Sequence, residues 1–230
     1  MQETSELYKQ LLRTPGHRKE IAAEIAGELY GEDRLITLNT YPRLFRNNKP
    51  EVGSAVASEL RMTLRRPGDI PNAAEIKPMY RLRLGDTVSE WVQKGVYYIY
   101  TRDPDDEMKT LTITAFDAMV KADPVWTPDQ SLEFPMTMRE AAEVIAALMG
   151  VELENPEDIS DVYTLDYPAN DWTQRNILQF IAAAHAANFF MTDLGKLRLD
   201  ELNNLPEETS YLVDSHGSVI LIGGVAIRVG

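Results

Sequence analysis

The sequence predicts a β-rich α+β protein in which an antiparallel barrel or sandwich precedes a small α/β subdomain. Between residues 17 and 122, short stretches of alternating apolar and polar residues follow one another, with turn residues between them. No long helical pattern separates these stretches, so antiparallel pairing is favoured over a parallel sheet. From about residue 135 onward, apolar residues recur at helical spacing instead.

The first part is expected to begin with a short helix over residues 5–12, where leucines recur at helical spacing before the stop signal Pro15-Gly16. Alternation then predicts strands around residues 21–28, 55–65, 76–84, 91–92, 95–100 and 111–114. Turns are expected at residues 31–33, 67–68, 85–86 and 103–106. The residues predicted to face the core are Leu60, Met62, Leu64, Tyr80, Leu82 and Leu84.

The first helix of the α/β part has the clearest boundaries in the sequence. Thr137 and Glu140 fit a capping box, and Gly150 fits a left-handed residue after the helix end, so we predict a helix over residues 137–149. The predicted apolar stripe consists of Met138, Ala141, Ala142, Ile145, Leu148 and Met149.

A second helix and a hairpin follow. The helix is predicted to begin near residues 171–174 and to end at about Asn188, a residue type that tolerates the left-handed conformation. Residues 189–192 and 197–199 read as a β-hairpin around a turn at 193–196.

These patterns divide the chain into four parts. They are an N-terminal helix (1–16), a β-barrel domain (17–131), an α/β subdomain (132–203) and a C-terminal pair of strands around His216-Gly217 (204–230). Gly223-Gly224 reads as a turn or bulge within the last part.

Composition restricts the class of protein. The 230 residues include no cysteine, which excludes disulfides, thiolate metal sites and cysteine nucleophiles. No run of about 18 apolar residues and no secretory signal pattern occurs, so membrane insertion is not expected. Residues 1–122 carry 18 basic and 18 acidic side chains, whereas residues 123–230 carry 5 basic and 18 acidic ones, which accounts for the whole net charge of −13. Such an acidic surface repels phosphate and disfavours sequence-specific DNA binding.

The residue types that perform catalysis do not fall into recognisable patterns. His17, His185 and His216 lack metal-ligand spacing, and we interpret His185 as a packed or capping residue. No phosphate-binding loop and no nucleophile elbow occurs. Two carboxylate clusters read as solvated surface rather than calcium or glycosidase sites: Asp103, Asp105, Asp106 and Glu107, and Glu152, Glu154, Glu157 and Asp158. The sequence therefore predicts no catalytic, cofactor-binding or metal-binding residue, and it indicates a protein that is not an enzyme.

Arginines and tryptophans are read as structural. Arg65, Arg66, Arg81 and Arg83 form the only concentrated positive charge, and we expect them to pair with acidic neighbours or with another subunit. The three tryptophans are expected to be core or interface anchors: Trp91, Trp126 and Trp172.

An ordered set of motifs supplies a family resemblance. The motifs of the first part are residues 53–64, 70–71, 74–76, 91–99 and 112–119, and those of the second part are residues 136–140, 173–182 and 188–192. Most of the signal comes from Lys94-Gly95-Val96-Tyr97-Tyr98-Ile99 and from Ala115-Phe116-Asp117-Ala118-Met119. Together the motifs cover most of residues 5–203, and they resemble prophage tail proteins of the baseplate hub type.

The resemblance implies a trimeric hub at the tail tip, in which each subunit contributes two tube-like β-barrel domains and three copies present a pseudo-sixfold ring to the tail tube. Residues 17–131 would be the first barrel, residues 132–203 the domain inserted between barrels, and residues 204–230 the start of the second barrel. One departure is that such proteins usually continue through the second barrel, whereas this sequence ends at Gly230.

The same resemblance implies partners and a location. The partners are further copies of the chain in a homotrimer, the tail tube and other baseplate or tail-tip proteins, and neither sequence-specific nucleic acid nor membrane insertion is expected. The location is the virion tail, after synthesis in the host bacterial cytoplasm. Because the acidic second region would repel its own copies near the axis, we expect it at the periphery of the ring.

Two alternative functions stay open at this point. The β-rich chain, its acidic balance and the exposed-looking Tyr97, Tyr98 and Trp126 fit a carbohydrate-binding module or a glycoside hydrolase, which needs two carboxylates across a cleft. The other alternative is a different tail adaptor or a tube protein, which would present its sheet to a central channel.

Overall fold

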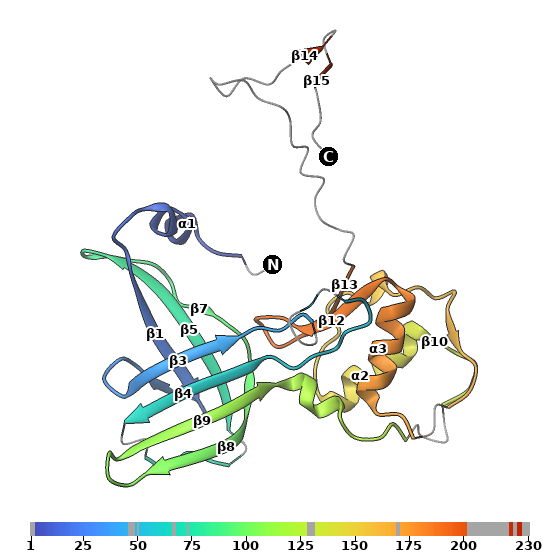
Figure 1. Cartoon of the computed structure of the whole chain (residues 1–230), viewed down its shortest axis with the longest axis horizontal. Helices are drawn as coiled ribbons and strands as arrows, with labels where there is room; N and C mark the ends of the chain where they lie inside the picture. Colours follow the sequence, from blue (N-terminus) through green and yellow to red (C-terminus); the bar gives the residue numbers. More distant parts are fainter. Residues whose placement is uncertain are drawn as a thin grey trace.

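The computed structural model describes residues 3–45, 49, 51–65, 68–72, 74–127, 132–168, 171–201, 221–222 and 225–226. Two parts lie side by side along the long axis of the molecule (Figure 1). The first, residues 18–117, is a large antiparallel sheet that we call the sheet unit. The second, residues 136–201, combines two helices with short antiparallel strand pairs, and we call it the α/β unit.

Helix α1 (Glu6–Arg13) precedes the sheet unit, which confirms the predicted N-terminal helix. The Ser5 side chain accepts a hydrogen bond from the Tyr8 backbone N–H at 3.0 Å and so caps the first turn. The Glu90 carboxylate accepts from both the backbone N–H and the hydroxyl of Ser5, at 2.7 and 2.6 Å. Leu11 is the buried residue of the helix. The helix is therefore held to the sheet unit by its cap and by one leucine.

Nine antiparallel strands form the sheet unit. They are β1 (Arg18–Ile25), β2 (Glu28–Tyr30), β3 (Leu35–Tyr41), β4 (Glu59–Arg65), β5 (Glu75–Leu84), β6 (Thr87–Val88), β7 (Val92–Gln93), β8 (Tyr97–Asp105) and β9 (Thr110–Asp117). Their order is β2-β1-β5-β8-β9-β4-β3, and β6 and β7 also pair with β5. Within the described residues no ladder joins β2 to β3, so the sheet is not closed by hydrogen bonds.

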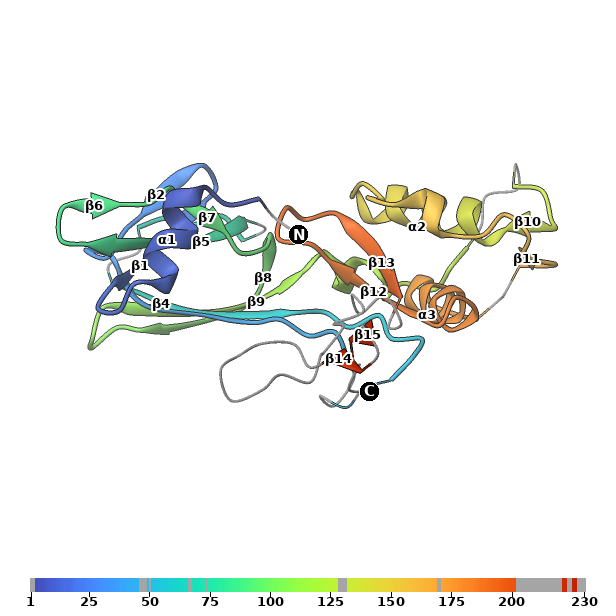
Figure 2. The same cartoon turned by 90° about the horizontal axis from the view of Figure 1, so that it is seen from above.

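The sheet nevertheless folds over onto itself. Figure 2 shows β1 and β5 in one layer and β4 and β9 in another. Between the layers lies one hydrophobic cluster, to which β1, β2, β3, β4, β5, β8 and β9 all contribute. A single core shared by almost every strand is what a strongly curled sheet produces.

Period-two alternation identified part of the core of the sheet unit. Leu60, Met62 and Leu64 are fully buried on β4, and Tyr80 is buried beside them. Leu82 is also buried, although it lies outside that cluster. The prediction was wrong for Leu84, which is only half-buried because it ends β5 next to a tight turn.

The predicted turn at residues 103–106 was also placed wrongly. Strand β8 continues through Asp103, Pro104 and Asp105, and the turn follows it, with Lys109 at φ 52°. Proline fits here because β8 pairs with β5 only near Tyr97 and Tyr98, so the missing N–H of Pro104 interrupts no ladder on that side.

Two helices and three strand pairs complete the described chain. The helices are α2 (Met138–Met149) and α3 (Gln174–Ala184), with the 3-10 turns η2 (Ala118–Ala122) and η3 (Pro156–Asp158). Strand β10 (Met136–Thr137) pairs with β11 (Thr164–Leu165), β12 (Ala187–Met191) with β13 (Leu197–Glu201), and β14 (Leu221–Ile222) with β15 (Val225–Ala226). No helix in the described part of the chain has the length and apolar character that crossing a membrane requires.

Both helices begin with a capping box. Thr137 and Glu140 form the predicted one at α2, and Gly150 ends the helix at φ 70°, as expected. The apolar stripe was predicted slightly out of phase, because the buried face of α2 includes Ala146, whereas Leu148 is exposed. A second capping box, which sequence reasoning did not identify, joins Thr173 to Asn176 at the start of α3.

Helix α3 ends earlier than predicted. It stops at Ala184, and the left-handed residue after it is Ala186, at φ 50°. Asn188 is instead a fully buried residue of β12. The hairpin of β12 and β13 itself confirms the predicted hairpin.

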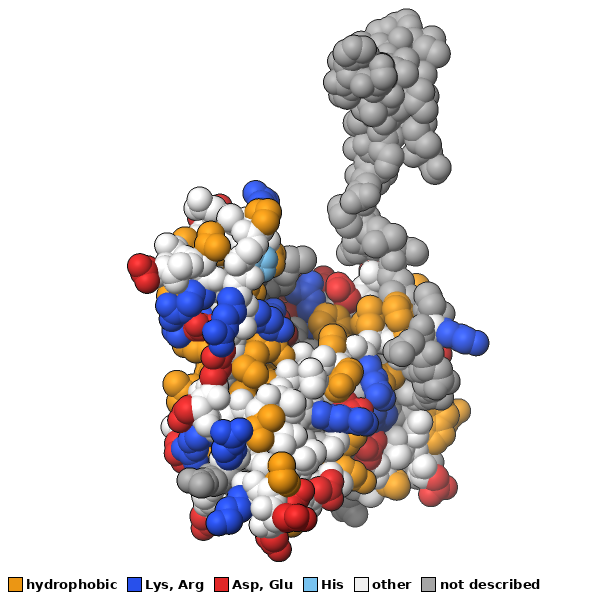
Figure 3. Space-filling view, turned by 60° about the vertical axis from the view of Figure 1, so that its left-hand side comes forward, with side chains coloured by type: hydrophobic (Ala, Val, Ile, Leu, Met, Phe, Trp, Pro, Cys, Tyr) orange, Lys and Arg blue, Asp and Glu red, His pale blue; other side chains and the backbone are white. Residues whose placement is uncertain are grey.

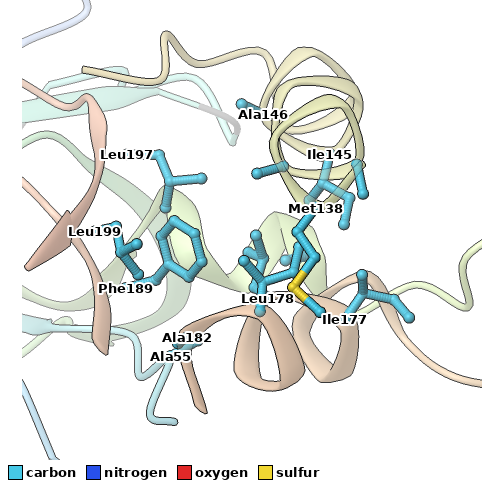
Figure 4. Packing of buried hydrophobic residues seen from close by; sticks show 14 of the residues in the cluster. Ala55, Met138, Ile145, Ala146, Ile177, Leu178, Ala182, Phe189, Leu197 and Leu199 are labelled. Carbon is cyan, nitrogen blue, oxygen red and sulfur yellow. The ribbon is translucent and has the colours of Figure 1, made fainter. Parts of the chain in front are cut away.

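A second hydrophobic cluster lies between the helices and the hairpin. Figure 4 shows Phe189 and Leu197 of the hairpin facing Leu178 of α3 and Ile145 of α2. Ala55, which precedes β4, also belongs to this cluster. The α/β unit therefore has its own core, and a segment of the sheet unit helps to build it.

The C-terminal part is described only at β14 and β15, whose backbones pair antiparallel. The predicted turns at His216-Gly217 and Gly223-Gly224 lie outside the described residues. The four domain boundaries given above stay predictions.

Candidate interaction surfaces

The first feature that bears on function is the junction between the two units. The segment before β4 runs alongside β12, where Ala55 and Phe189 form a parallel bridge. The Gly53 N–H donates to the Ala187 carbonyl at 2.9 Å, and the Phe189 N–H donates to the Ser54 carbonyl at 2.8 Å. A parallel bridge between Leu153 and Leu197 extends the hairpin on its other side. The hairpin is thus the centre of a small four-segment sheet that includes both units.

Asn188 fixes this junction with its side chain. Its Oδ1 accepts from the Ser54 N–H at 2.7 Å, and its Nδ2 donates to the Glu51 carbonyl at 2.9 Å. Because the side chain is fully buried, both bonds form away from water, where an unpaired partner would be costly.

The tip of the hairpin makes a second attachment. The Asp193 carbonyl accepts from the Gly95 N–H at 3.1 Å and from Gln93 Nε2 at 2.8 Å, and its carboxylate pairs with Lys94 at 3.0 Å. Gly195 has φ +79°, and a Cβ there would lie 2.8 Å from Val96 Cγ2. The two units are therefore joined at two places by close backbone contact.

Asp117 ends β9 at the same junction. Its carboxylate is buried and accepts from the Ser58 N–H at 2.8 Å and from the Met119 N–H at 3.0 Å. Burial raises the pKa of Asp117 to about 6, although these hydrogen bonds and the nearby Arg175 act in the opposite direction. Arg175 of α3 reaches back to donate to the Met119 carbonyl at 2.8 Å.

Strand β3 is one of the two edge strands of the sheet unit, the other being β2. It pairs with β4 on one side, and no described strand pairs with its other side. Ile36 and Tyr41 are each 44% exposed along it. An edge strand with free backbone groups and apolar side chains is a site at which other chains add to a sheet.

The cationic face of the sheet unit is largely internally paired. Arg81 and Arg83 of β5 both donate to the Glu20 carboxylate of β1, and these bonds, with Arg83 contributing most, lower the pKa of Glu20. The Arg81 guanidinium also lies over the Trp91 ring at 4.3 Å. The predicted pairing with acidic neighbours is confirmed for these two arginines. Figure 3 shows Lys and Arg side chains clustered toward the upper left of this view, with Asp and Glu side chains among them.

An exposed aromatic pocket lies on the α/β unit. It has a volume of about 390 Å³ and is lined by Thr164, Leu165, Asp166, Tyr167, Pro168, Trp172, Ile177 and Phe180. Tyr167 is 74% exposed, and the Trp172 and Phe180 rings meet edge to face with their centroids 6.1 Å apart. A smaller hollow with Asn176 and Gln179 adjoins it. Sequence reasoning singled out Trp172 but missed Tyr167 and Phe180.

The histidines and carboxylates considered in the sequence are dispersed. His185 caps α3: its Nε2 accepts from the Ser160 N–H at 2.9 Å, and its Nδ1 bonds the Ile181 carbonyl, which confirms the predicted role. Glu152 pairs with Lys196, directly before β13, and Glu154 pairs with Arg198 of β13. Among the described residues, no three His, Asp or Glu side chains come together in a way that could hold a metal ion. His216 and Arg66 lie outside the described residues.

The aromatic residues that suggested carbohydrate binding are not a surface platform. Tyr97 and Trp126 are buried in the two hydrophobic clusters. Tyr98 is half-buried beneath Lys121, whose Nζ lies 3.6 Å from the centre of the ring. The expectation of exposed Tyr97 and Trp126 was wrong, because the fold turns both toward a core. Trp126 confirms the predicted core anchor, whereas Trp172 is exposed.

Comparisons with known proteins identify a fold. The chain shares its fold with the tail protein from Neisseria meningitidis at a TM-score of 0.50 and 14% identity, over 79% of this chain and 50% of that one. A 43 kDa tail protein of prophage MuSo2 from Shewanella oneidensis gives a TM-score of 0.49 at 14% identity, over 78% and 54%. The chain spans about half the length of these structures. No family model matches the sequence, and no curated protein matches it.

Proposed function

We propose that the chain is a structural, non-catalytic component of a phage or prophage tail. More specifically, it is a baseplate or tail-tip hub protein that assembles as a ring of three copies and joins the tail tube to the tip. The observation that carries this proposal is the curled antiparallel sheet with the open edge strand β3, in a fold shared with a tail protein.

The sheet geometry supports assembly in a ring. A curled sheet that wraps one core would act as a tube-type barrel segment, and its edge strand β3 has one side that forms no ladder with a described strand. Joining the edge of one copy to a different surface of the next is a heterologous contact, which closes into a ring when the rotation is correct.

The rigid junction supports a fixed radial position for the α/β unit. Because hydrogen bonds at both Asn188 and Asp193 tie it to the sheet unit, it moves with the sheet unit as one body. The acidic region after residue 122 then lies at the periphery, where like charges of neighbouring copies are separated by solvent and screened. The tail tube and other baseplate or tail-tip proteins would contact the sheet units, in the virion tail.

An edge-blocking substitution tests the proposal. A lysine on an exposed strand edge opposes strand addition, so Ile36→Lys should convert the assembly to monomer in sedimentation velocity. Val162→Lys is the matched control, because Val162 is 83% exposed on the α/β unit and should leave the assembly unchanged. An Ile36→Lys protein that assembles like the control would show that β3 is not the ring contact.

A further inference from the structure

The aromatic pocket and helix α1 have complementary surfaces that neither uses within one chain. We propose that the pocket around Tyr167, Trp172 and Phe180 receives helix α1 of a second copy of this chain. The inference rests on the proposed ring assembly and deepens it, because it names one contact between neighbouring copies.

The pocket has an apolar interior and an acidic rim. Its floor contains the buried Ile177, and its walls are the exposed rings of Tyr167 and Trp172. Covering exposed aromatic surface of this kind removes apolar area from water, which favours binding of a partner. Asp166 lines the pocket, and Asp171 is exposed directly before Trp172. The occupant that fits is an apolar side chain accompanied by cations.

Helix α1 presents that combination on its solvent face. Leu12 is 56% exposed, whereas its neighbour Leu11 turns toward the sheet unit. Lys9 lies three residues before Leu12, and Arg13 lies four residues after Lys9, so the three side chains share one face of the helix. Lys9 pairs with Glu6 at 2.8 Å, but both side chains are largely exposed, and such surface pairs exchange partners at little cost.

The positions of α1 and the pocket in the molecule mean that the contact forms between two copies and not within one chain. Figures 1 and 2 both show α1 at the sheet-unit end and α3 at the opposite end. A chain therefore cannot place its own α1 in its own pocket, and filling the pocket joins copies head to tail. A two-turn helix buries much less than the roughly 1,600 Å² of a standard interface, so this contact adds to the sheet contacts rather than replacing them.

Cysteine cross-linking tests the proposal, because the chain contains no cysteine of its own. A Gln10→Cys variant, which keeps Leu12 intact, is mixed with a Gln179→Cys variant, whose substituted position lies beside Trp172 and Phe180, and a short bismaleimide linker is added. Mass spectrometry of the peptides should identify a link between position 10 of one copy and position 179 of another. The matched control replaces Gln179→Cys with Met108→Cys, at a position that is 70% exposed in the turn between β8 and β9, and should give at least tenfold less product.

A charge exchange then separates a specific contact from chance collisions. Adding Lys9→Glu and Arg13→Glu to the Gln10→Cys chain should abolish the link, and adding Asp166→Lys and Asp171→Lys to the Gln179→Cys chain should restore it. Cross-linking no greater than the Met108→Cys control, while the unmodified chain still forms trimers, overturns the docking of α1 but leaves the ring intact. A pocket that takes a sugar or another tail protein gives this same result. A chain that neither cross-links nor assembles overturns both proposals.

Discussion

The sheet unit and the α/β unit are stabilised by contacts of different range. In the sheet unit, neighbouring strands come from distant parts of the chain, as where β1 pairs with β5 and β4 with β9. In the α/β unit, capping boxes that span four residues and a hairpin with a short turn define the elements. Motifs read from sequence are local, so they locate the elements of the α/β unit better than the shape of the sheet. At the junction, Asn188 binds a segment more than a hundred residues away and so links the locally defined α/β unit to the sheet unit.

The largest expected effect comes from the core shared across the junction. Phe189→Ala removes a fully buried ring and should lower the free energy of unfolding by about 3–5 kcal/mol. If the two units unfold together, calorimetry shows a single transition that shifts as a whole. Phe180→Ala, at a ring that is 43% exposed, is the control and should have a much smaller effect. A variant in which only part of the heat absorption shifts would show that the units are independent.

A glycine at the junction tests how closely the two units are packed against each other. Gly53→Ala places a Cβ 2.9 Å from the Ala183 Cβ at φ +80°, so overpacking of about 1–3 kcal/mol adds to backbone strain of about 1–2 kcal/mol. Gly85→Ala is the control, because its φ is +57° and nothing lies within 4 Å of the added Cβ. Urea denaturation should give the larger loss for Gly53→Ala. Equal losses of unfolding free energy would mean that α3 shifts away from the added Cβ without a measurable cost in stability.

The buried carboxylate at the junction predicts a pH dependence. The pKa of Asp117 is about 6 in the folded chain, above its value of about 3.9 in an unfolded chain. Its contribution to stability is therefore complete below about pH 4 and is lost as the pH rises through 6, a change on the order of 3 kcal/mol. The difference in unfolding free energy between wild type and Asp117→Asn should fall from about pH 4 to about pH 7. A difference that grows with pH would show that the N–H groups of Ser58 and Met119 outweigh burial.

The smallest effect concerns a purely local contact. Thr137→Ala removes the cap of α2 and should cost about 1 kcal/mol, visible as a lowered Tm in thermal melts. Thr173→Ala at α3 should behave alike, because it breaks the second capping box. Unchanged melts would mean that these caps do not define the helix starts.

Particular residues show which features of the structure can be predicted from the sequence. The alternation of Leu60, Met62 and Leu64 predicts their burial because each signal lies within one strand. Asn188 was misread as a helix end, since its partners Ser54 and Glu51 are remote in sequence and the chain has no local signal for them.

The edge and pocket could not be predicted for a similar reason. The exposed edge of β3 follows from the strand order, which depends on pairing between distant segments. Tyr167, Trp172 and Phe180 gather from a loop, a helix entry and a helix, so no single periodicity connects them. Surfaces of this kind become visible only when the fold places their parts together.

The mass of the assembled chain in solution tests the central claim most directly. Light scattering over a range of protein concentrations, at about 0.1 M and 1 M salt, covers Debye lengths of about 10 and 3 Å and so separates charge effects from strand pairing. If the chain forms the proposed ring, the particle at high concentration contains three chains of 26.0 kDa each. A strict monomer at every concentration, in both low and high salt, would contradict the ring.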